Sequence, residues 1–518
     1  MKRHLLYASL LTAGVLCASQ GMAQDQVVTL TTAKANGEKV TLRVNQLKKG
    51  VTVDWGDGNP VSYAATNDDL LVIEGTTKGT VITLKADKKL NTLVCDGNEL
   101  TALDVGQAPN LISLYCQNNQ LTTLNVSALS ALTDLNCANN NLQKLLIVDS
   151  ANPAIENLNV AGNELATNQA ASTSTTFYYK GSALQHLNVA GNKFKALNLT
   201  ANRALDMLVC NDNGLKNRLN LTMTDSITTV VAHSNEFSAM SMPSSGGKKL
   251  RKLVINDNQI PTLSLESCLQ LHTLMCKNNG LTSVGLPAKT KLDVMECGGN
   301  KLSFSSLPSS KSMPTHITYT PQEENLDITQ WLQHDDTGYY MDVCTNWNDR
   351  LKDPYVLKIH DLMLDPDGGK TIKAQWMKID ENGQPAEMTK ASTAAKANDY
   401  LPLTSTTSYG NVTFLNPYGK VYALFTSTVY PELTFKTTVF RTGKDTPVGI
   451  GQVTTGDNGL TVTVANKQLT LSAGTDTHVR VYATSGRAVW QGKVAAGETV
   501  QLNLPAGVYV VNGKKVVL

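Results

Sequence analysis

The sequence predicts an all-β-dominated protein built around a solenoid of short parallel strands, with smaller β domains on either side. Between Leu90 and Leu307 one short pattern of leucine, cysteine and asparagine recurs ten times, at a spacing of 21 to 29 residues. Outside that stretch, strand-like runs alternate with clusters of Gly, Asn and Asp, which is typical of strands and turns. At 518 residues the chain is also too long for one compact domain, so several modules are expected.

The repeat is clearest in its first copy, where Leu90, Leu93, Cys95, Asn98 and Leu100 occupy fixed offsets. The ten copies open at Leu90, Leu111, Leu132, Ile155, Leu184, Leu205, Ile227, Leu250, Leu271 and Leu292. A period in the low twenties with Leu and Asn at set positions predicts a leucine-rich-repeat solenoid. Each repeat of such a solenoid buries its apolar face only by stacking on its neighbours.

Each repeat predicts one short strand and one tight turn. Leu93 and Cys95 alternate with Thr92, Val94 and Asp96, so one face of the strand is buried. The asparagine recurs in all ten copies, as Asn98, Asn119, Asn140, Asn163, Asn192, Asn213, Asn235, Asn258, Asn279 and Asn300. A buried Asn amide can bond the backbone of the sharp turn behind the strand, so we expect its role to be structural.

Six of the nine cysteines share one offset of the repeat, namely Cys95, Cys116, Cys137, Cys210, Cys276 and Cys297. Val160, Val189, Ala232 and Ile255 fill that offset in other copies, so the position requires a small apolar group. Neighbouring strands lie ~4.8 Å apart with parallel side chains, whereas a disulfide places β-carbons ~3.8 Å apart. We therefore predict free, buried thiols, and no metal site, because ligands in a straight row cannot surround an ion.

The solvent side of the strands is where a partner would touch the solenoid. The outward position between the buried Leu and Cys holds Tyr115 in the second copy, Asn in copies three to five, and an apolar row in copies six to nine. We predict partner binding by Tyr115 and by the row Val209, Val231, Val254 and Met275. The alternative is that valine is present there because it suits strands.

The fourth repeat carries extra residues, the segment 166–183, which is rich in Ser and Thr and contains Phe177, Tyr178 and Tyr179. Insertions in solenoids map to surface loops, often on the binding side, and tyrosine is a good contact residue. These three aromatics are therefore candidate partner-binding residues. An extra strand packed on the edge of the solenoid is the alternative prediction.

The chain before the repeats predicts an export signal and a β cap. Residues 1–23 combine a basic start, an apolar run and a small-residue cleavage site, which is typical of a signal peptide. Residues 24–89 contain short strand-like runs that we expect to cover the open end of the solenoid. Asp54 and Asp57 within them are either calcium ligands or the side chains of a Gly-rich turn, and the turn is favoured.

After the solenoid, which we place at 90–322 with its closing segment, residues 323–445 alternate strand-like runs with turns. This spacing predicts an Ig-like, antiparallel β-sandwich with Trp376 in its core. No cysteine pair brackets that tryptophan. Asp365 and Asp367 lie in one of the turn signals, and the sequence leaves open whether they bind calcium.

The repeats resemble the short cysteine-containing type of internalin J and its relatives in Bacteroidota. The series Leu-x-x-Leu-x-Cys-x-x-Asn-x-Leu carries this resemblance over roughly two fifths of the chain. The resemblance implies a surface protein involved in adhesion or biofilm formation. The partner would be a host or bacterial surface protein or glycan.

Residues 446–518 are predicted to hold a linker and a terminal β domain. Their strand-like runs and terminal Lys-Val-Val-Leu resemble the C-terminal sorting domain of type IX secretion cargo. The residues that match this signal are Val481, Tyr482, Gly486, Pro505, Gly507, Tyr509 and Lys515. The resemblance implies transfer across the outer membrane by the type IX machinery, removal of the domain by its sorting protease, and surface lipopolysaccharide as an attachment point.

Composition and motifs limit the function classes. The net charge of +2 does not favour nucleic acid as a partner. No metalloprotease His pair, nucleophile elbow, phosphate loop or Cys-x-x-Cys pair is present, so neither catalysis nor a cofactor is predicted. The favoured function is a secreted or cell-surface adhesin, located extracellularly or at the outer membrane. The alternatives are a surface hydrolase that uses the repeats for targeting, and a rigid stalk that presents residues 323–445.

Overall fold

A computed structural model describes residues 25–45, 47, 50–64, 70–147, 152–167, 175–289, 291–336, 338–344, 347–380, 382–391, 399–443, 453–455, 459–465, 468–483, 486–505, 508–512 and 514–517. The chain divides into two compact units, Met1–Leu302 with Ser306–Gln322, and Ser303–Ser305 with Glu323–Leu518. The signal segment predicted at residues 1–23 lies outside the described residues. Within the described ranges no helix is long and apolar enough to cross a membrane.

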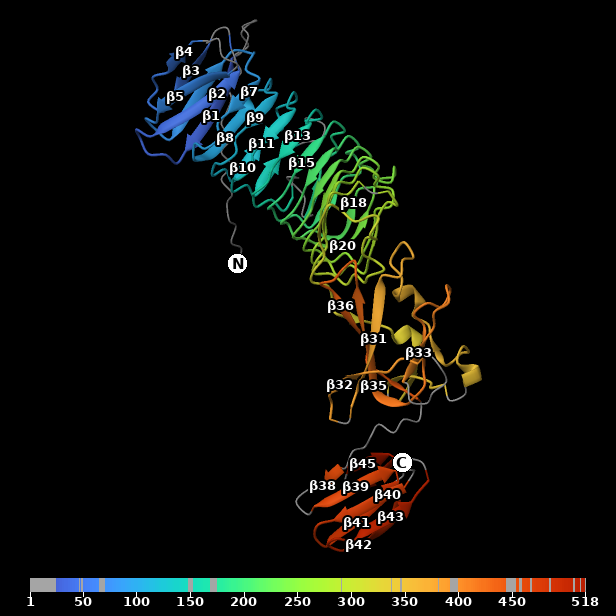
Figure 1. The fold of residues 1–518 in the computed structure, drawn as a ribbon. Coiled ribbons are helices and arrows are strands. Elements are labelled where there is room, and N and C mark those ends of the chain that lie inside the picture. The colour runs from blue at the N-terminus through green and yellow to red at the C-terminus, as the bar shows by residue number, and fades with distance from the viewer. Residues whose placement is uncertain are drawn as a thin grey trace. The chain divides into compact units, whose positions relative to one another are not determined.

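The first unit is built on one long sheet in which each repeat supplies a three-residue strand (Figure 1). The repeat strands are β7 (Thr92–Val94), β9 (Ser113–Tyr115), β11 (Asp134–Asn136), β13 (Asn157–Asn159), β15 (His186–Asn188), β17 (Met207–Val209), β19 (Thr229–Val231), β21 (Lys252–Val254), β23 (Thr273–Met275) and β25 (Val294–Glu296). Neighbours pair in parallel and in register, so that Leu114, Leu135 and Leu158 stack in one column. The middle residue of every strand is buried, which confirms the predicted parallel β-solenoid.

The other side of the repeats forms short strands as well, paired two by two in parallel. These strands are β10 (Thr123–Asn125) with β12 (Lys144–Leu146), β14 (Thr176–Tyr178) with β16 (Ala196–Asn198), β18 (Lys216–Asn220) with β20 (Glu236–Ser241), and β22 (Thr262–Ser264) with β24 (Ser283–Gly285). Most repeats are only 21 to 23 residues long, which leaves no length for a helix on this side.

The repeated asparagine ties each repeat to the one before it. Asn140 Oδ1 accepts from the backbone N–H of Leu121 at 3.0 Å. Its Nδ2 donates to the carbonyls of Cys116 at 3.0 Å and Cys137 at 3.1 Å. All ten of these asparagines are at most 8% exposed. The predicted structural role of the column is therefore confirmed, and the bonds run between repeats as well as within the turn.

The residue directly before each asparagine has a left-handed backbone, with φ between 53° and 70° in all ten copies. These residues are Gly97, Asn118, Asn139, Gly162, Gly191, Asp212, Ser234, Asp257, Asn278 and Gly299. Gly, Asn and Asp tolerate this conformation better than other residues. This column makes the sharp turn that aims the asparagine amide back at the strand.

The asparagine ladder continues into the flanking segments at both ends of the sheet. At the first repeat, Asn98 exchanges bonds of 3.0 and 2.8 Å with the backbone of Thr41 in the preceding domain. At the last, β26 (His316–Thr318) adds an eleventh parallel strand, and Gln322 stands where the next asparagine would fall. Its Oε1 accepts from the Leu302 N–H at 2.9 Å and its Nε2 donates to the Cys297 carbonyl at 2.8 Å.

The strands before the first repeat continue its sheets in antiparallel fashion. Their bounds are β1 (Gln26–Thr32), β2 (Lys39–Asn45), β3 (Val51–Asp54), β4 (Val61–Tyr63), β5 (Leu70–Thr76) and β6 (Val81–Ala86). Strand β2 pairs with β7 and with β5, while β1 pairs with β6 and with β8 (Leu100–Gln107) of the first repeat. The first rung of the solenoid is thus covered on both of its sides.

The Asp54–Gly58 segment of this domain is a turn organised by its own side chains. Asp54 Oδ1 accepts from the backbone N–H groups of Gly56, Asp57 and Gly58 at 2.8 to 3.2 Å. Asp57 forms a 2.8 Å ion pair with Lys78, and a hydrogen bond from that ammonium group holds the pKa of Asp57 below its usual value. These carboxylates act as turn stabilisers, as the favoured alternative predicted.

The first part of the second unit, up to Thr442, contains an eight-stranded and a three-stranded sheet. The larger sheet comprises β27 (Asn325–Leu326), β28 (Gln333–Asp335), β29 (Gly338–Met341), β31 (Ile372–Ile379), β32 (Pro385–Glu387), β35 (Tyr418–Ser427), β36 (Thr434–Thr437) and β37 (Phe440–Thr442). The smaller one comprises β30 (Val356–Leu357), β33 (Tyr400–Pro402) and β34 (Val412–Phe414). Three short 3-10 helices, η1 (Thr329–Trp331), η2 (Trp347–Asp349) and η3 (His360–Leu362), lie in the connections.

Trp376 is 1% exposed and packs edge-to-face on Phe414 and Phe440, one from each sheet, so its predicted core position is confirmed. The region is mostly antiparallel, as predicted, but two of its described strand pairs are parallel. Strand β27 pairs in parallel with β36, and β29 with β37. About a hundred residues separate these partners in sequence, which is ample for the crossover that a parallel pair requires.

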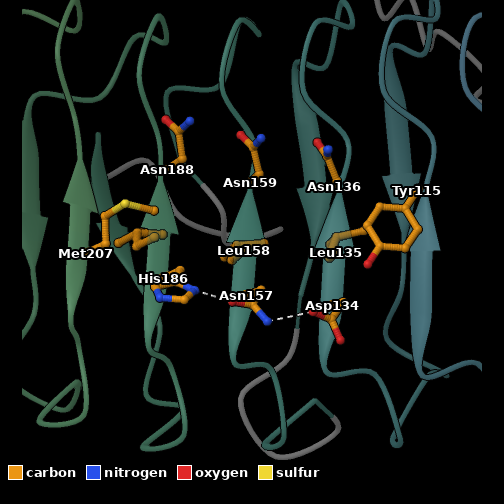
Figure 2. A pocket seen from close by; sticks show the side chains of 11 residues that line it. Tyr115, Asp134, Leu135, Asn136, Asn157, Leu158, Asn159, His186, Asn188 and Met207 are labelled. Carbon is orange, nitrogen blue, oxygen red and sulfur yellow. Dashed lines mark hydrogen bonds between the residues drawn. The ribbon is translucent and has the colours of Figure 1, made fainter. Parts of the chain in front are cut away.

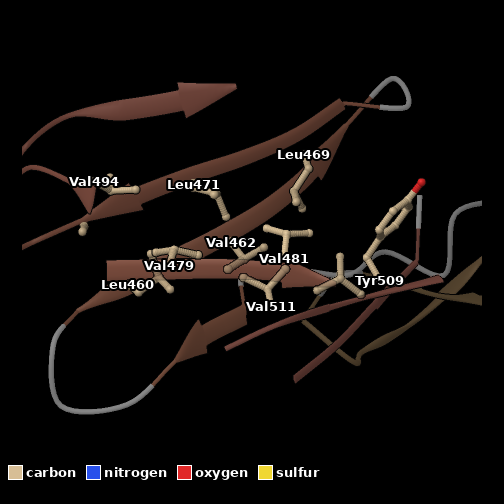
Figure 3. Close-up of a cluster of buried hydrophobic side chains, with 11 residues drawn as sticks. Leu460, Val462, Leu469, Leu471, Val479, Val481, Val494, Tyr509 and Val511 are labelled. Carbon is tan, nitrogen blue, oxygen red and sulfur yellow. The ribbon is translucent and has the colours of Figure 1, made fainter. Parts of the chain in front are cut away.

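The tail forms two four-stranded antiparallel sheets around a common apolar core (Figure 3). One sheet contains β38 (Val453–Thr455), β39 (Leu460–Ala465), β40 (Gln468–Ala473) and β43 (Thr499–Asn503), and the other β41 (Thr477–Ala483), β42 (Ala488–Val494), β44 (Val508–Val511) and β45 (Lys514–Val517). Leu469 and Leu471 come from the first sheet, and Val479 and Val511 from the second.

The residues assigned to the sorting signal are divided between the core and the turns of this tail. Val481 and Tyr509 are buried, and the Tyr509 hydroxyl donates to the Pro505 carbonyl at 2.8 Å. Tyr482, the second-last residue of strand β41, is half-buried, and Gly486 lies in a turn with a left-handed φ of 80°. Gly507 and the side chain of Lys515 lie outside the described residues.

Candidate functional site

The outward face of the repeat sheet carries the first and third residues of each strand. The predicted apolar row occupies third positions there, and strand pairing places Val209, Val231, Val254 and Met275 in adjacent rungs. Val209, Val231 and Met275 are half-buried, but Val254 is only 7% exposed. None of the four side chains is fully exposed, so the row offers a partner little apolar area.

A depression of about 330 Å³ lies on the same face, over the strands β11, β13 and β15. Tyr115 of β9 lies at one end and Met207 of β17 at the other (Figure 2). The remaining lining residues are Asp134, Leu135, Asn136, Asn157, Leu158, Asn159, His186, Leu187 and Asn188. Three rungs with short outward side chains, between a tyrosine and a methionine, therefore produce a shallow site with two raised ends.

The upper row of this depression consists of Asn136, Asn159 and Asn188 (Figure 2). Each Oδ1 accepts from the backbone N–H two residues ahead, at 3.2, 3.2 and 3.1 Å. With the oxygens held by the backbone, the three Nδ2 groups donate to no other residue in the described part of the chain. The row thus presents three fixed donors, one per rung.

The lower row is a chain of hydrogen bonds that crosses the strands (Figure 2). Asn157 Nδ2 donates to Asp134 Oδ1 at 2.6 Å, and Asn157 Oδ1 lies 2.5 Å from His186 Nδ1. Because the Asn157 oxygen can only accept, His186 carries its proton on Nδ1 in this arrangement. His186 Nε2 in turn lies 3.8 Å from Asp206 Oδ2, and both side chains are more than 40% exposed.

The aromatic residues of the fourth-repeat insertion do not lie on this face. Phe177 and Tyr179 are fully buried. Phe177 packs edge-to-face on Phe194, and the Tyr179 hydroxyl donates to the Asn152 carbonyl. Their assignment as partner-binding residues is wrong, because strand β14 pairs with β16 and turns them into the core, as the alternative predicted. Tyr178, between them, is half-buried.

The cysteine column is part of the core. Cys95, Cys116, Cys137, Cys210, Cys276 and Cys297 are free and buried, as predicted. Burial raises the pKa of Cys137 and Cys297 to about 12, and it raises the pKa of the other four thiols as well. Cys268, off the column, is also buried, and its pKa is raised to about 11 for the same reason. A thiolate is the reactive form of cysteine, so the folded column is chemically inert.

Iodoacetamide at pH 8 is therefore expected to leave the six column cysteines of the folded protein unmodified and to alkylate all six after denaturation without reductant. Peptide mass spectrometry measures both states, and a Cys116–Cys137 pair that resists alkylation when denatured would contradict the assignment.

The raised pKa of the buried thiols also makes the stability of the fold depend on pH. The unfolded thiols lose protons near pH 9 while the folded ones keep theirs, so stability should fall as the pH rises from about 9 toward 12.

No cluster of three or more His, Cys, Asp or Glu with metal-binding geometry occurs among the described residues. In the 323–445 region, Asp365 Oδ1 accepts from the backbone N–H groups of Asp367 at 3.0 Å and Gly369 at 2.7 Å, so it serves as a turn stabiliser.

The depression on the outward face is the candidate binding site of the repeat sheet. Sequence analysis identified its Tyr115 but not its lower row. Three successive repeats carry a polar residue directly before the buried leucine, namely Asp134, Asn157 and His186. This pattern could have indicated the lower row from the sequence.

The chain is similar to several solved leucine-rich-repeat structures. No protein-family model matches the chain, and no curated protein matches it. The functional domain of InlJ from Listeria monocytogenes, described as including a cysteine ladder, is 18% identical and aligns over 69% of this chain and 92% of its own, with a TM-score of 0.34. YopM, a leucine-rich effector protein from Yersinia pestis, is 20% identical over 45% of this chain and 67% of its own, with a TM-score of 0.36. The leucine-rich-repeat domain of APL1B is 20% identical over 46% and 70%, with a TM-score of 0.35.

Proposed function

We propose that this protein is an exported adhesin or biofilm component that binds a surface partner through the outward face of its repeat sheet. The observation that carries the proposal is the depression between Tyr115 and Met207, in which outward side chains are held in fixed orientations by hydrogen bonds to neighbouring residues. Side chains oriented before binding lose less conformational entropy when a partner arrives. A surface that carries polar side chains in fixed orientations is suited to binding a partner.

The export part of the proposal rests on the basic and apolar segment at residues 1–23 and on the tail. The tail folds around its own core, in which the signal residues Val481 and Tyr509 take part. A self-contained terminal domain can be removed without opening the core of the preceding region, as a sorting protease would require. Type IX secretion and a location at the outer-membrane surface or beyond follow from this proposal.

Arginine substitutions on the outward face test the binding role in the full-length protein. Asn159→Arg fills the depression, and Val231→Arg interrupts the apolar row. If the face binds the partner, at least one variant should weaken adhesion to cells by roughly tenfold or more, the effect of losing about 1.4 kcal/mol. The matched control is Thr123→Arg, an exposed strand position on the other side of the repeats. Cell-binding isotherms measure the effect, and thermal melts verify the fold.

Equal adhesion by all three variants would mean that the repeat face is not the binding surface. The solenoid would then serve as a stalk for the 323–445 region, which is the structural alternative.

A further inference from the structure

We infer that the depression between Tyr115 and Met207 binds a neutral, extended oligosaccharide whose chain runs across the strands from β9 to β17. This inference rests on the proposed function and names the chemical class of its ligand. The site lies on the outward face of the sheet, and its donors, its acceptors and its aromatic end each favour a hydroxyl-rich chain.

The first argument is the regular row of donors. Asn136, Asn159 and Asn188 each point one Nδ2 group outward, because the backbone holds each Oδ1. Parallel pairing repeats this donor at the strand spacing, ~4.8 Å. A ligand that matches the row must offer an acceptor at a regular step of similar length, as the successive rings of an extended sugar chain do.

The second argument is the mixed chemistry of the lower row. Asp134 offers carboxylate oxygens, while Asn157 and His186 are held between donor and acceptor neighbours. A hydroxyl group both donates and accepts. Asp134 already accepts from Asn157 and from the Thr133 hydroxyl, and each carboxylate oxygen has a further lone pair. A chain of hydroxyls can therefore accept from the donor row and donate to the carboxylate at the same time, whereas a ligand with acceptors alone could use only the donor row.

The third argument is the pair of raised ends. The Tyr115 ring is half-buried at one end of the floor, and Met207 closes the other (Figure 2). A tyrosine ring presents a flat apolar face to the C–H face of a sugar, and its hydroxyl can form a hydrogen bond. Such a combination of one aromatic surface with a few placed polar groups is typical of small-ligand sites.

The lining also disfavours the other ligand classes. It contains no Lys or Arg and has one carboxylate, so a phosphate- or sulfate-bearing chain would meet no cation. Protein interfaces concentrate their binding energy in buried clusters of aromatic residues and arginine. Here Tyr115 is the single aromatic residue besides His186.

The test uses the full-length protein and an array of neutral hexose and N-acetylhexosamine tetra- to hexasaccharides, with a sulfated heparin-type hexasaccharide as the anionic probe. Calorimetry then gives the Kd of the best neutral probe. Tyr115→Ala and Asn159→Ala should each weaken that Kd by roughly tenfold or more. Tyr115→Phe should retain most of the affinity, because it keeps the ring. Thr229→Ala is the matched control, on the same face but outside the depression, and should leave the Kd unchanged.

The inference is overturned if no neutral probe binds at millimolar concentration, if the sulfated probe is preferred, or if the Tyr115→Ala and Asn159→Ala variants bind as the wild type does. Adhesion to cells that depends on Tyr115 but is abolished by treating the cells with protease, and not with glycosidases, also overturns it in favour of a protein ligand. That result would leave the proposed adhesin function intact. The proposed adhesin function would be refuted by a different result, namely cell adhesion that stays the same in every variant of the outward face.

Discussion

Asn140→Ala is expected to lower the free energy of unfolding of the solenoid by about 2 kcal/mol. The substitution removes the acceptor of the Leu121 N–H and the donor to the Cys116 and Cys137 carbonyls. The Leu121 N–H loses its acceptor, whereas the Cys116 and Cys137 carbonyls still accept from the side-chain amides of Asn119 and Asn163. A buried backbone group left without a partner costs about 1–3 kcal/mol. Asn140 is itself 6% exposed, so water cannot readily take its place.

Hydrogen exchange measured by mass spectrometry on the full-length protein is the appropriate readout. Each repeat contacts only its neighbours, so protection should be lost first in the second to fourth repeats. The control is Asn141→Ala, which changes the next residue, an exposed one, and should alter stability by less than about 0.5 kcal/mol. Similar exchange profiles for the two variants would show that the asparagine column does not hold the repeats together.

Removal of residues 446–518 is expected to abolish surface display completely and to leave the protein in the periplasm. The deletion takes away both sheets of the tail together with their shared core. Strand β37 ends at Thr442, before the deletion begins, so Trp376 and its neighbours keep their packing. Failure of export could then not be attributed to an exposed core in the remaining chain.

Cell fractionation and protease accessibility of intact cells measure this outcome. Gln501→Ala is the matched control, since it alters an exposed position of β43 and leaves the tail folded. Normal display of the shortened chain would refute the assignment of the tail as a sorting signal. Loss of display by the control as well would mean that the assay reports on expression.

The repeats were predictable because every copy places the same residue type in the same environment. The column through Leu114 and Leu135, the asparagines such as Asn140 and the buried thiols such as Cys137 follow from a period that ten copies establish independently. The left-handed column could have been predicted as well, because Gly97, Asn118 and Asp212 belong to residue types that favour positive φ.

Features that depart from the period were not predictable in the same way. Phe177 and Tyr179 lie in an insertion without register, so only the pairing of β14 with β16 determines which side chains enter the core. The depression depends on contacts between rungs, such as the bond from Asn157 to Asp134, which no single repeat encodes. Val254 is buried while Val231 beside it is half-buried, although both are valines at the same position of the repeat.

The asparagine ladder ends on Thr41 on one side and on Gln322 on the other, and the repeat that each of these residues bonds is the adjacent one. In the described part of the chain neither end of the ladder bonds to the interior repeats, so the number of interior repeats does not affect the bonds at either end. A whole copy could be gained or lost between Leu111 and Leu292 while both ends stay intact. Each such event would change the length of the sheet by one strand spacing, ~4.8 Å. Gene duplication could therefore adjust the number of contiguous recognition positions in equal steps, with no redesign of the domains at either end.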